Sequence, residues 1–196
     1  MVTGSDGVDN YGSQITSFEH WIVWGGGVAD QVQLGAGRDK FKGYGGDDSA
    51  LGMAGADRLN GSVGNDVLSG GDGGDHMIGG PGIDCQTGGL GADVFAFGRL
   101  ERAGDLITDF TSGGDRIAIA SAALVGALPL GAVDDAHFHP DFALGPDGQF
   151  VYRASSTAGL TELIWDFNGA EAGEEFLVAL FSGGPTMAAT DIDILA

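Results

Sequence analysis

The chain has 196 residues and a formal net charge of −20, from 28 acidic and 8 basic side chains. A hydrophobic fraction of 43% is ordinary for a globular protein, so the composition excludes bulk disorder. The charge disfavours nucleic acid as a partner, because a polyanion needs a basic face. Because Cys85 is the single cysteine, a disulfide framework and paired-cysteine zinc or redox sites are also excluded.

The N-terminal residues 1–14, MVTGSDGVDNYGSQ, lack the basic and apolar regions of a secretory signal, so we expect no N-terminal signal peptide. An apolar patch at residues 18–24 predicts that residues 1–24 form an irregular coil packed on the residues after them. The longest uncharged run, residues 117–133, reaches only the short edge of a membrane span and contains Pro129. We interpret it as a buried strand, a turn and a loop, and expect no transmembrane segment.

Aspartate recurs every nine residues from Asp30 to Asp93, so eight consecutive nonapeptides fill residues 25–96. Their shared pattern is GGxGxDxUx, where U is apolar. Glycines at positions one, two and four permit positive φ, which lets the first six residues turn tightly and aim successive carbonyls at one point. Positions seven to nine predict a short strand whose eighth residue points inward. The sequence therefore predicts an all-β fold built on a parallel β-roll.

The eighth positions form the predicted core of this roll. They are occupied by Val32, Phe41, Ala50, Leu59, Leu68, Met77, Gln86 and Phe95. Gln86 interrupts the apolar ladder, and a buried amide needs hydrogen-bond partners. We expect either a looser coil around Gln86 and Ala50, or a position for Gln86 near the end of the roll, where water reaches it.

Two nonapeptides make one full coil, so aspartates eighteen residues apart become neighbours, about 4.8 Å apart. One edge of the roll carries Asp30, Asp48, Asp66 and Asp84, and the other carries Asp39, Asp57, Asp75 and Asp93. Anions stacked this closely demand cations. Calcium suits carboxylate and carbonyl oxygens in flexible geometry, whereas zinc prefers His or Cys.

Three gaps between the four turns on each edge give about six calcium ions. The predicted ligands are the eight repeat aspartates together with turn glycines, namely Gly55, Gly64, Gly73, Gly82 and Gly91. The alternative is a glycine-rich solenoid in which each Asp only caps its own turn.

Several repeats depart from the pattern. Val28 replaces a fourth-position glycine, Leu34 a first-position glycine, and Tyr44, Met53 and Ser62 occupy second positions. We expect these turns to bind less tightly or to be strained, which places the best sites between Asp57 and Asp93.

The array resembles the repeats-in-toxin (RTX) family of Gram-negative secreted proteins. Residues 92–120 look like the ADxFxF…GDxIxDFxxGxDxI segment that follows the repeats in serralysin-type proteases. Residues 161–196 are similar to the family's C-terminal strands, which serve as an uncleaved signal for type I secretion. The resemblance implies calcium binding, transport by the type I secretion machinery and an extracellular location.

A solenoid needs a cap on its open end, and residues 97–196 are expected to supply a β-rich one. Alternating patterns predict strands at residues 116–119, 150–153, 163–167 and 176–181, with turns at 145–148 and 168–173. No long helix is expected.

No catalytic motif is found: HExxH and GxSxG are both absent, and no GxG pair continues into a dinucleotide loop. His137 and His139 either bind a transition metal with Asp141 or are plain surface residues. Asp105, Asp109 and Asp115 either ligate a last calcium at the junction, as the resemblance suggests, or cap turns. Asp166 is interpreted as a solvated turn residue.

These patterns favour a calcium-binding RTX module that folds on extracellular calcium, supports type I secretion and has no catalysis of its own. One alternative is the C-terminal secretion and folding domain of a larger hydrolase, epimerase or toxin, with an upstream catalytic or adhesive domain. Another is a calcium-dependent adhesion or surface-layer protein.

Overall fold

The computed structural model describes residues 2–3, 20–99, 104–124, 128, 130–140, 148–166 and 175–196. The chain divides into two compact units, Met1–Phe95 and Ala96–Ala196. Regular structure in the described residues consists of β-strands and two short 3-10 helices, which confirms the predicted all-β class.

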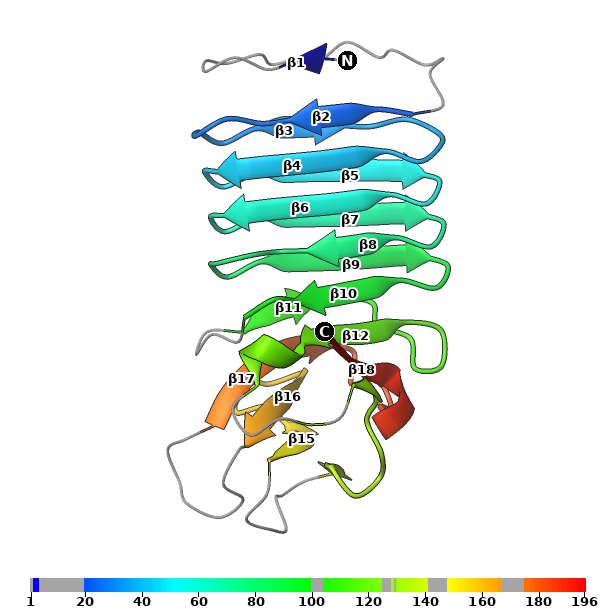
Figure 1. Ribbon diagram of the computed structural model, residues 1–196. Helices are drawn as coiled ribbons and strands as arrows, with labels where there is room; N and C mark the ends of the chain where they lie inside the picture. The colour runs from blue at the N-terminus through cyan, green and yellow to red at the C-terminus, as the bar shows by residue number, and fades with distance from the viewer. Residues whose placement is uncertain are drawn as a thin grey trace. The chain divides into compact units, whose positions relative to one another are not determined.

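The first unit is a parallel β-roll of two facing sheets. One sheet contains, in spatial order, β1 (Val2–Thr3), β2 (Ile22–Trp24), β4 (Lys40–Gly45), β6 (Arg58–Val63), β8 (His76–Ile78) and β10 (Val94–Phe97). The other contains β3 (Gln31–Gln33), β5 (Ser49–Ala54), β7 (Val67–Asp72) and β9 (Cys85–Leu90). Within the repeats, neighbouring strands pair in parallel eighteen residues apart, as in Lys40 with Arg58, and form the stacked coils of Figure 1. This confirms two nonapeptides per coil.

The strands are longer than the three residues predicted. β4, β5, β6, β7 and β9 each have six residues, so they continue to the third position of the next nonapeptide. Along β4, Phe41 and Gly43 are buried while Lys40, Lys42 and Tyr44 are exposed. Alternation along the strand therefore turns both the eighth position and the following first position toward the core.

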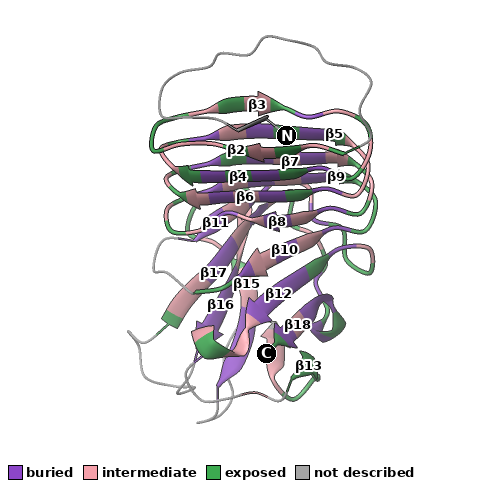
Figure 2. Ribbon diagram, turned by 45° about the horizontal axis from the view of Figure 1, so that its top comes forward, coloured by how far each residue is buried: buried purple, intermediate pink, exposed green. Residues whose placement is uncertain are grey.

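The predicted ladder forms the core between the two sheets, visible as buried stripes in Figure 2. Every described eighth position from residue 41 onward is at most 2% exposed, and Val32 is half-buried. Gln86 is fully buried, so the expectation that water reaches it is wrong. A buried Leu or Phe contributes about 1.5–3 kcal/mol, and one such residue in nine makes this a thin core.

Three non-glycine residues occupy the left-handed region of backbone space. They are Tyr44 (φ 73°), Met53 (φ 81°) and Ser62 (φ 80°), all at the second position of their repeats. In later repeats glycine takes the same conformation, as at Gly80 (φ 117°). An L-residue is disfavoured there by contact between Cβ and the backbone, so the expected strain at these three turns is present.

The second unit consists of short strands in two sets. One set contains, in spatial order, β14 (Phe138–Pro140), β15 (Gln149–Ala154), β16 (Leu160–Asp166), β17 (Glu175–Ser182) and β11 (Asp105–Ile107). The other set contains, in spatial order, β12 (Arg116–Ala120), β18 (Ile192–Leu195) and β13 (Gly131–Ala132). The unit also contains the 3-10 helices η1 (Ser121–Ala123) and η2 (Ala189–Asp191). The four predicted strands are found here, except that residue 167 lies outside the described residues, as do the predicted turns apart from Gly148.

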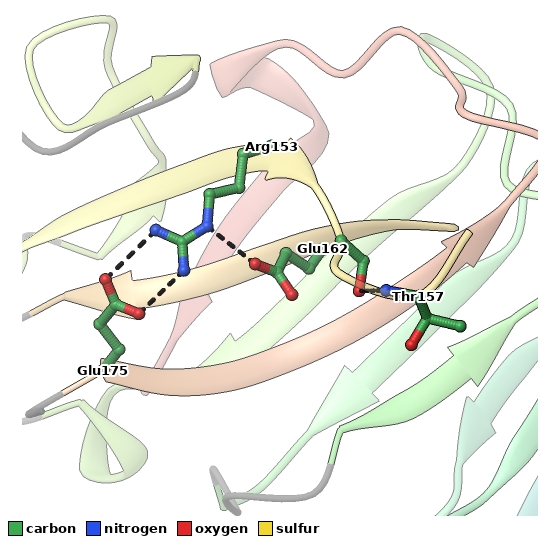
Figure 3. Close-up of polar contacts among 5 residues, drawn as sticks. Arg153, Thr157, Glu162 and Glu175 are labelled. Atoms are coloured by element: carbon green, nitrogen blue, oxygen red, sulfur yellow. Dashed lines mark hydrogen bonds and ion pairs between the residues drawn. The ribbon is translucent and has the colours of Figure 1, made fainter. Parts of the chain in front are cut away.

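Charged side chains tie the antiparallel strands of this unit together. Arg153 on β15 pairs with Glu162 on β16 at 2.8 Å and with Glu175 on β17 at 3.0 Å (Figure 3). In the same strands Phe150 packs against Trp165, with ring centroids 4.8 Å apart. Asp166 ends β16 and is only 5% exposed, so its interpretation as a solvated turn residue is wrong.

We predict that Ser62→Gly stabilises the calcium-loaded protein by about 1 kcal/mol, because glycine relieves the strained φ. Gly80→Ala, at the same position one coil later, is the matched control. A Cβ there would lie 1.8 Å from the Ser62 carbonyl oxygen, so a loss of at least about 2 kcal/mol is expected. Thermal unfolding followed by circular dichroism measures both, and destabilisation by Ser62→Gly would contradict the strain.

Candidate metal centre

Two rows of buried carboxylates run along the roll. Seven of the eight repeat aspartates are at most 1% exposed, namely Asp39, Asp48, Asp57, Asp66, Asp75, Asp84 and Asp93, and Asp30 is half-buried. In each row the backbone N–H of one Asp donates to Oδ1 of the Asp eighteen residues later, as from Asp30 to Asp48 at 2.8 Å. The same 2.8 Å contact recurs five times, and it groups the aspartates into the two predicted edges.

The second carboxylate oxygen, Oδ2, differs from Oδ1 in its hydrogen bonding. In Asp48, Asp57, Asp66 and Asp75, Oδ2 is buried and makes no hydrogen bond. Leaving a buried polar atom without a partner costs about 1–3 kcal/mol, and more when it carries charge. These four oxygens therefore lie where a cation would be stabilising.

Burial has a direct effect on these acids. It raises the pKa of Asp48 and of Asp57 to about 6, opposed in part by the backbone hydrogen bond that each accepts. Neighbouring carboxylates of the same row raise these two pKa values further. Burial likewise raises the pKa of Asp66 and Asp75. Without a cation, these carboxyls therefore bind protons more readily in the folded array than in the unfolded chain.

The first carboxylate of each row is satisfied locally. Oδ2 of Asp30 accepts the Gly26 backbone N–H at 2.8 Å, and Oδ2 of Asp39 accepts that of Gly35 at 3.1 Å. These two aspartates cap their own turns, as the alternative interpretation of the repeat expected. The rows are therefore not uniform along the roll.

First-position glycines make room for these carboxylates. A Cβ built on Gly43, Gly61 or Gly70 would lie 1.9–2.2 Å from the Oδ2 of the Asp five residues later. The first-position glycines of the repeats do not have positive φ, whereas described glycines at positions two and four from Gly71 onward do. The prediction that all three glycine positions serve positive φ is thus wrong for the first, where space is the requirement.

Fourth-position glycines stack carbonyl groups along the same turns. Gly55, Gly64, Gly73, Gly82 and Gly91 all have φ between 136° and 144°. A Cβ on Gly73 would lie 1.5 Å from the Gly55 carbonyl oxygen, and the other four show the same approach from the preceding coil. Each turn thus combines a buried carboxylate with closely stacked backbone carbonyls, the hard oxygen donors that calcium prefers.

No group of three or more His, Cys, Asp or Glu side chains gathers among the described residues. A cation in these turns would therefore depend on backbone carbonyls as well as carboxylates. This composition suits calcium and does not suit zinc.

The remaining sequence candidates lie in the second unit. His137 Nδ1 lies 2.5 Å from Asp134 Oδ1, and His139 Nε2 lies 3.1 Å from the Ala136 carbonyl oxygen. Asp141, their suggested third ligand, falls outside the described residues. Oδ2 of Asp115 accepts the Thr111 backbone N–H at 2.7 Å, which is the turn-capping role.

Sequence reasoning missed Asp191. This carboxylate is 1% exposed and accepts hydrogen bonds from Ser112 Oγ (2.6 Å), Gly113 N (3.0 Å) and Ala188 N (2.9 Å). It joins two turns about eighty residues apart in the sequence, so no local pattern pointed to it.

The raised pKa values predict how metal-free protein responds to pH. Between pH about 4 and about 6 the folded array binds more protons than the unfolded chain, so the free energy of unfolding falls as pH rises. We expect more β-structure in chelator at about pH 5 than at about pH 7.5, measured by far-ultraviolet circular dichroism. Asp57→Asn should flatten this dependence and Asp135→Asn, at an exposed site, should not; an equal effect of the two would contradict the assignment.

The family described as RTX calcium-binding nonapeptide repeat (four copies) matches residues 24–55 and 51–84. No curated protein matches the chain significantly. The solution structure of the AlgE6R3 subunit of the Azotobacter vinelandii mannuronan C5-epimerase is 25% identical, covering 86% of this chain and 79% of that chain, with a TM-score of 0.42. The AlgE6R2 subunit of the same enzyme is 23% identical, covering 85% of this chain and 91% of that chain, with a TM-score of 0.39.

Among the described residues, no helix is long and apolar enough to cross a membrane. The family match covers seven of the eight repeat aspartates, from Asp30 to Asp84, and ends before Asp93. Residues 24–84 of this chain therefore belong to the RTX family of calcium-binding nonapeptide repeats.

Proposed function

We propose that the repeat array is a module that folds on binding calcium and has no catalysis of its own. The observation that carries the proposal is the set of buried Oδ2 atoms without hydrogen bonds in Asp48, Asp57, Asp66 and Asp75. Their position beside closely stacked carbonyls gives a cation both charge and hard oxygen ligands.

The ligands in this proposal are the eight repeat aspartates and the carbonyls of the fourth-position glycines Gly55, Gly64, Gly73, Gly82 and Gly91, with about six ions in all. Binding is not equal along the array. The Oδ2 atoms of Asp30 and Asp39 already accept hydrogen bonds, from Gly26 and Gly35. These two aspartates contribute less to affinity than Asp48, Asp57, Asp66 and Asp75.

Each carboxylate has two roles in this mechanism. Its Oδ1 accepts a backbone N–H from the preceding coil and sets the register of stacking, while its Oδ2 is available to the cation. Bound calcium supplies the positive charge that lets neighbouring carboxylates remain ionised. Without it, repulsion along each row opposes a thin core, so binding free energy becomes folding free energy.

Extracellular calcium modules bind at about 0.1–1 mM, and a switch with an affinity in this range would fold outside the cell. Type I secretion and an extracellular location are parts of the same proposal. They are supported by the resemblance of residues 92–120 and 161–196 to family segments. A chain that leaves the cell unfolded would then fold where calcium is abundant.

The switch predicts that metal-free protein at neutral pH gains β-structure cooperatively at roughly millimolar calcium. Far-ultraviolet circular dichroism during a calcium titration measures this. Magnesium is the control, since it keeps its own waters and requires a stricter octahedron. A spectrum already folded in chelator and unchanged by calcium would overturn the proposal.

The Oδ2 atoms of Asp30 and Asp39 accept hydrogen bonds, whereas that of Asp57 does not. We therefore expect single substitutions to differ in their effects. Asp57→Asn should weaken calcium-dependent folding by roughly 1–3 kcal/mol, because it removes the charge at an oxygen with no other partner. Asp30→Asn should cost clearly less, and the exposed Asp135→Asn should leave the calcium midpoint unchanged. Calorimetric titration of the three variants checks this, and equal losses for Asp30→Asn and Asp57→Asn would refute the inequality.

A further inference from the structure

One outer face of the roll is basic although the chain as a whole is strongly acidic. Lys40, Lys42 and Arg58, three of the eight Lys and Arg residues, are exposed on β4 and β6. The outward seventh, ninth and second positions along β2, β4, β6 and β8 carry no acidic side chain. The same positions along β3, β5, β7 and β9 carry no charged side chain at all. The cations are thus confined to one of two otherwise equivalent faces.

These three cations lie close together on neighbouring strands. Lys40 and Arg58 are paired residues on neighbouring strands, about 4.8 Å apart, and Lys42 follows Lys40 by two residues, about 6.6 Å along the strand. Among the described residues none of the three forms an ion pair with a carboxylate. Their charges therefore face solvent, where an anionic partner can reach them.

Two exposed aromatic side chains flank the cations. Trp24 is 45% exposed and is the strand partner of Lys42. Tyr44 is 49% exposed, and Lys42 Nζ lies 4.7 Å from the centroid of its ring. We call Trp24, Lys40, Lys42, Tyr44 and Arg58 together the basic face.

Tyr44 occupies this face at a cost to stability. Its φ of 73° belongs to the region that the repeat pattern assigns to glycine, and an L-residue there costs about 1–2 kcal/mol. Strained residues of this kind gather at functional sites, where the side chain is needed. Ser62, and Met53 on the opposite sheet, share this backbone conformation, so the case for this face rests on its charges and exposed aromatic rings.

We propose that the basic face binds a linear acidic polysaccharide that carries carboxylates on its sugar rings. The carboxylates would pair with Lys40, Lys42 and Arg58, and the apolar faces of the rings would stack on Trp24 and Tyr44. The flat strand surface suits an extended chain.

Other polyanions fit this face less well. A nucleic acid duplex carries one charge per about 1.7 Å, and the −20 protein opposes so dense a charge. Clusters that hold anionic membranes have about 4–8 basic residues, against the three found here. The proposal needs only the folded array and does not depend on which turns hold calcium.

The test uses the full chain in saturating calcium and oligogalacturonates too short to gel with calcium. Neutral dextran oligomers of similar length are the negative control. We expect oligogalacturonate binding that weakens with added salt, because exposed charge pairs are screened. Binding that matches dextran, or no binding, would overturn the proposal, as would tighter binding to duplex DNA or to phosphatidylserine vesicles.

Single substitutions distinguish binding at the basic face from non-specific attraction to positive charge. Lys40→Gln, Lys42→Gln and Arg58→Gln should each weaken binding about two- to fivefold, the range of exposed ion pairs. Arg38→Gln removes the same charge from an exposed turn residue outside this face and should have little effect. Equal losses from Arg38→Gln and Lys42→Gln would refute a defined site.

Tyr44→Gly distinguishes binding from folding. This change should raise thermal stability by relieving the strained φ, and should also weaken oligogalacturonate binding by removing the aromatic surface. Weaker binding from a more stable protein cannot result from loss of fold. Higher stability with unchanged affinity would remove Tyr44 from the site, and unchanged affinity in the three cation variants as well would overturn the proposal.

Discussion

The structure depends on the close stacking of anionic side chains in its interior. Parallel coils bring aspartates eighteen residues apart to the spacing of neighbouring strands, and the backbone N–H of one donates to the Oδ1 of the next in each row. The Oδ2 atoms of Asp48, Asp57, Asp66 and Asp75 are then buried without a hydrogen bond. Since the eighth-position core contributes one side chain per nine residues, this electrostatic cost is large relative to the hydrophobic gain.

The glycines are the counterpart of this arrangement. First-position glycines such as Gly61 leave the space that the carboxylate fills, and fourth-position glycines such as Gly73 bring carbonyls of successive coils together. Removing either kind would separate the oxygen atoms that a cation needs. The same regularity leaves the outer faces free to differ, which is why Lys40, Lys42 and Arg58 can share one face without disturbing the interior.

Much of this could be predicted from sequence, because a nine-residue period determines both strand register and which aspartates meet. The eighth-position ladder and the two rows are direct consequences of that period. Local pattern could not show that first-position glycines serve space, nor that Asp30 and Asp39 cap their own turns, since both depend on contacts in three dimensions. Asp191 was beyond sequence reasoning for the same reason, because its carboxylate accepts hydrogen bonds from Ser112 and Gly113, far away in the sequence. Asp166 was misread as a turn residue because β16 continues as far as it.

The most direct test of the central claim is hydrogen exchange of the backbone amides that donate to the next carboxylate within each row. They include the amides of Asp48, Asp57 and Asp66. If buried carboxylates require a cation, these amides should exchange freely at neutral pH in chelator and become strongly protected in calcium, but not in magnesium. Strong protection of the same amides in chelator would show that the rows are stable without metal and would contradict the account.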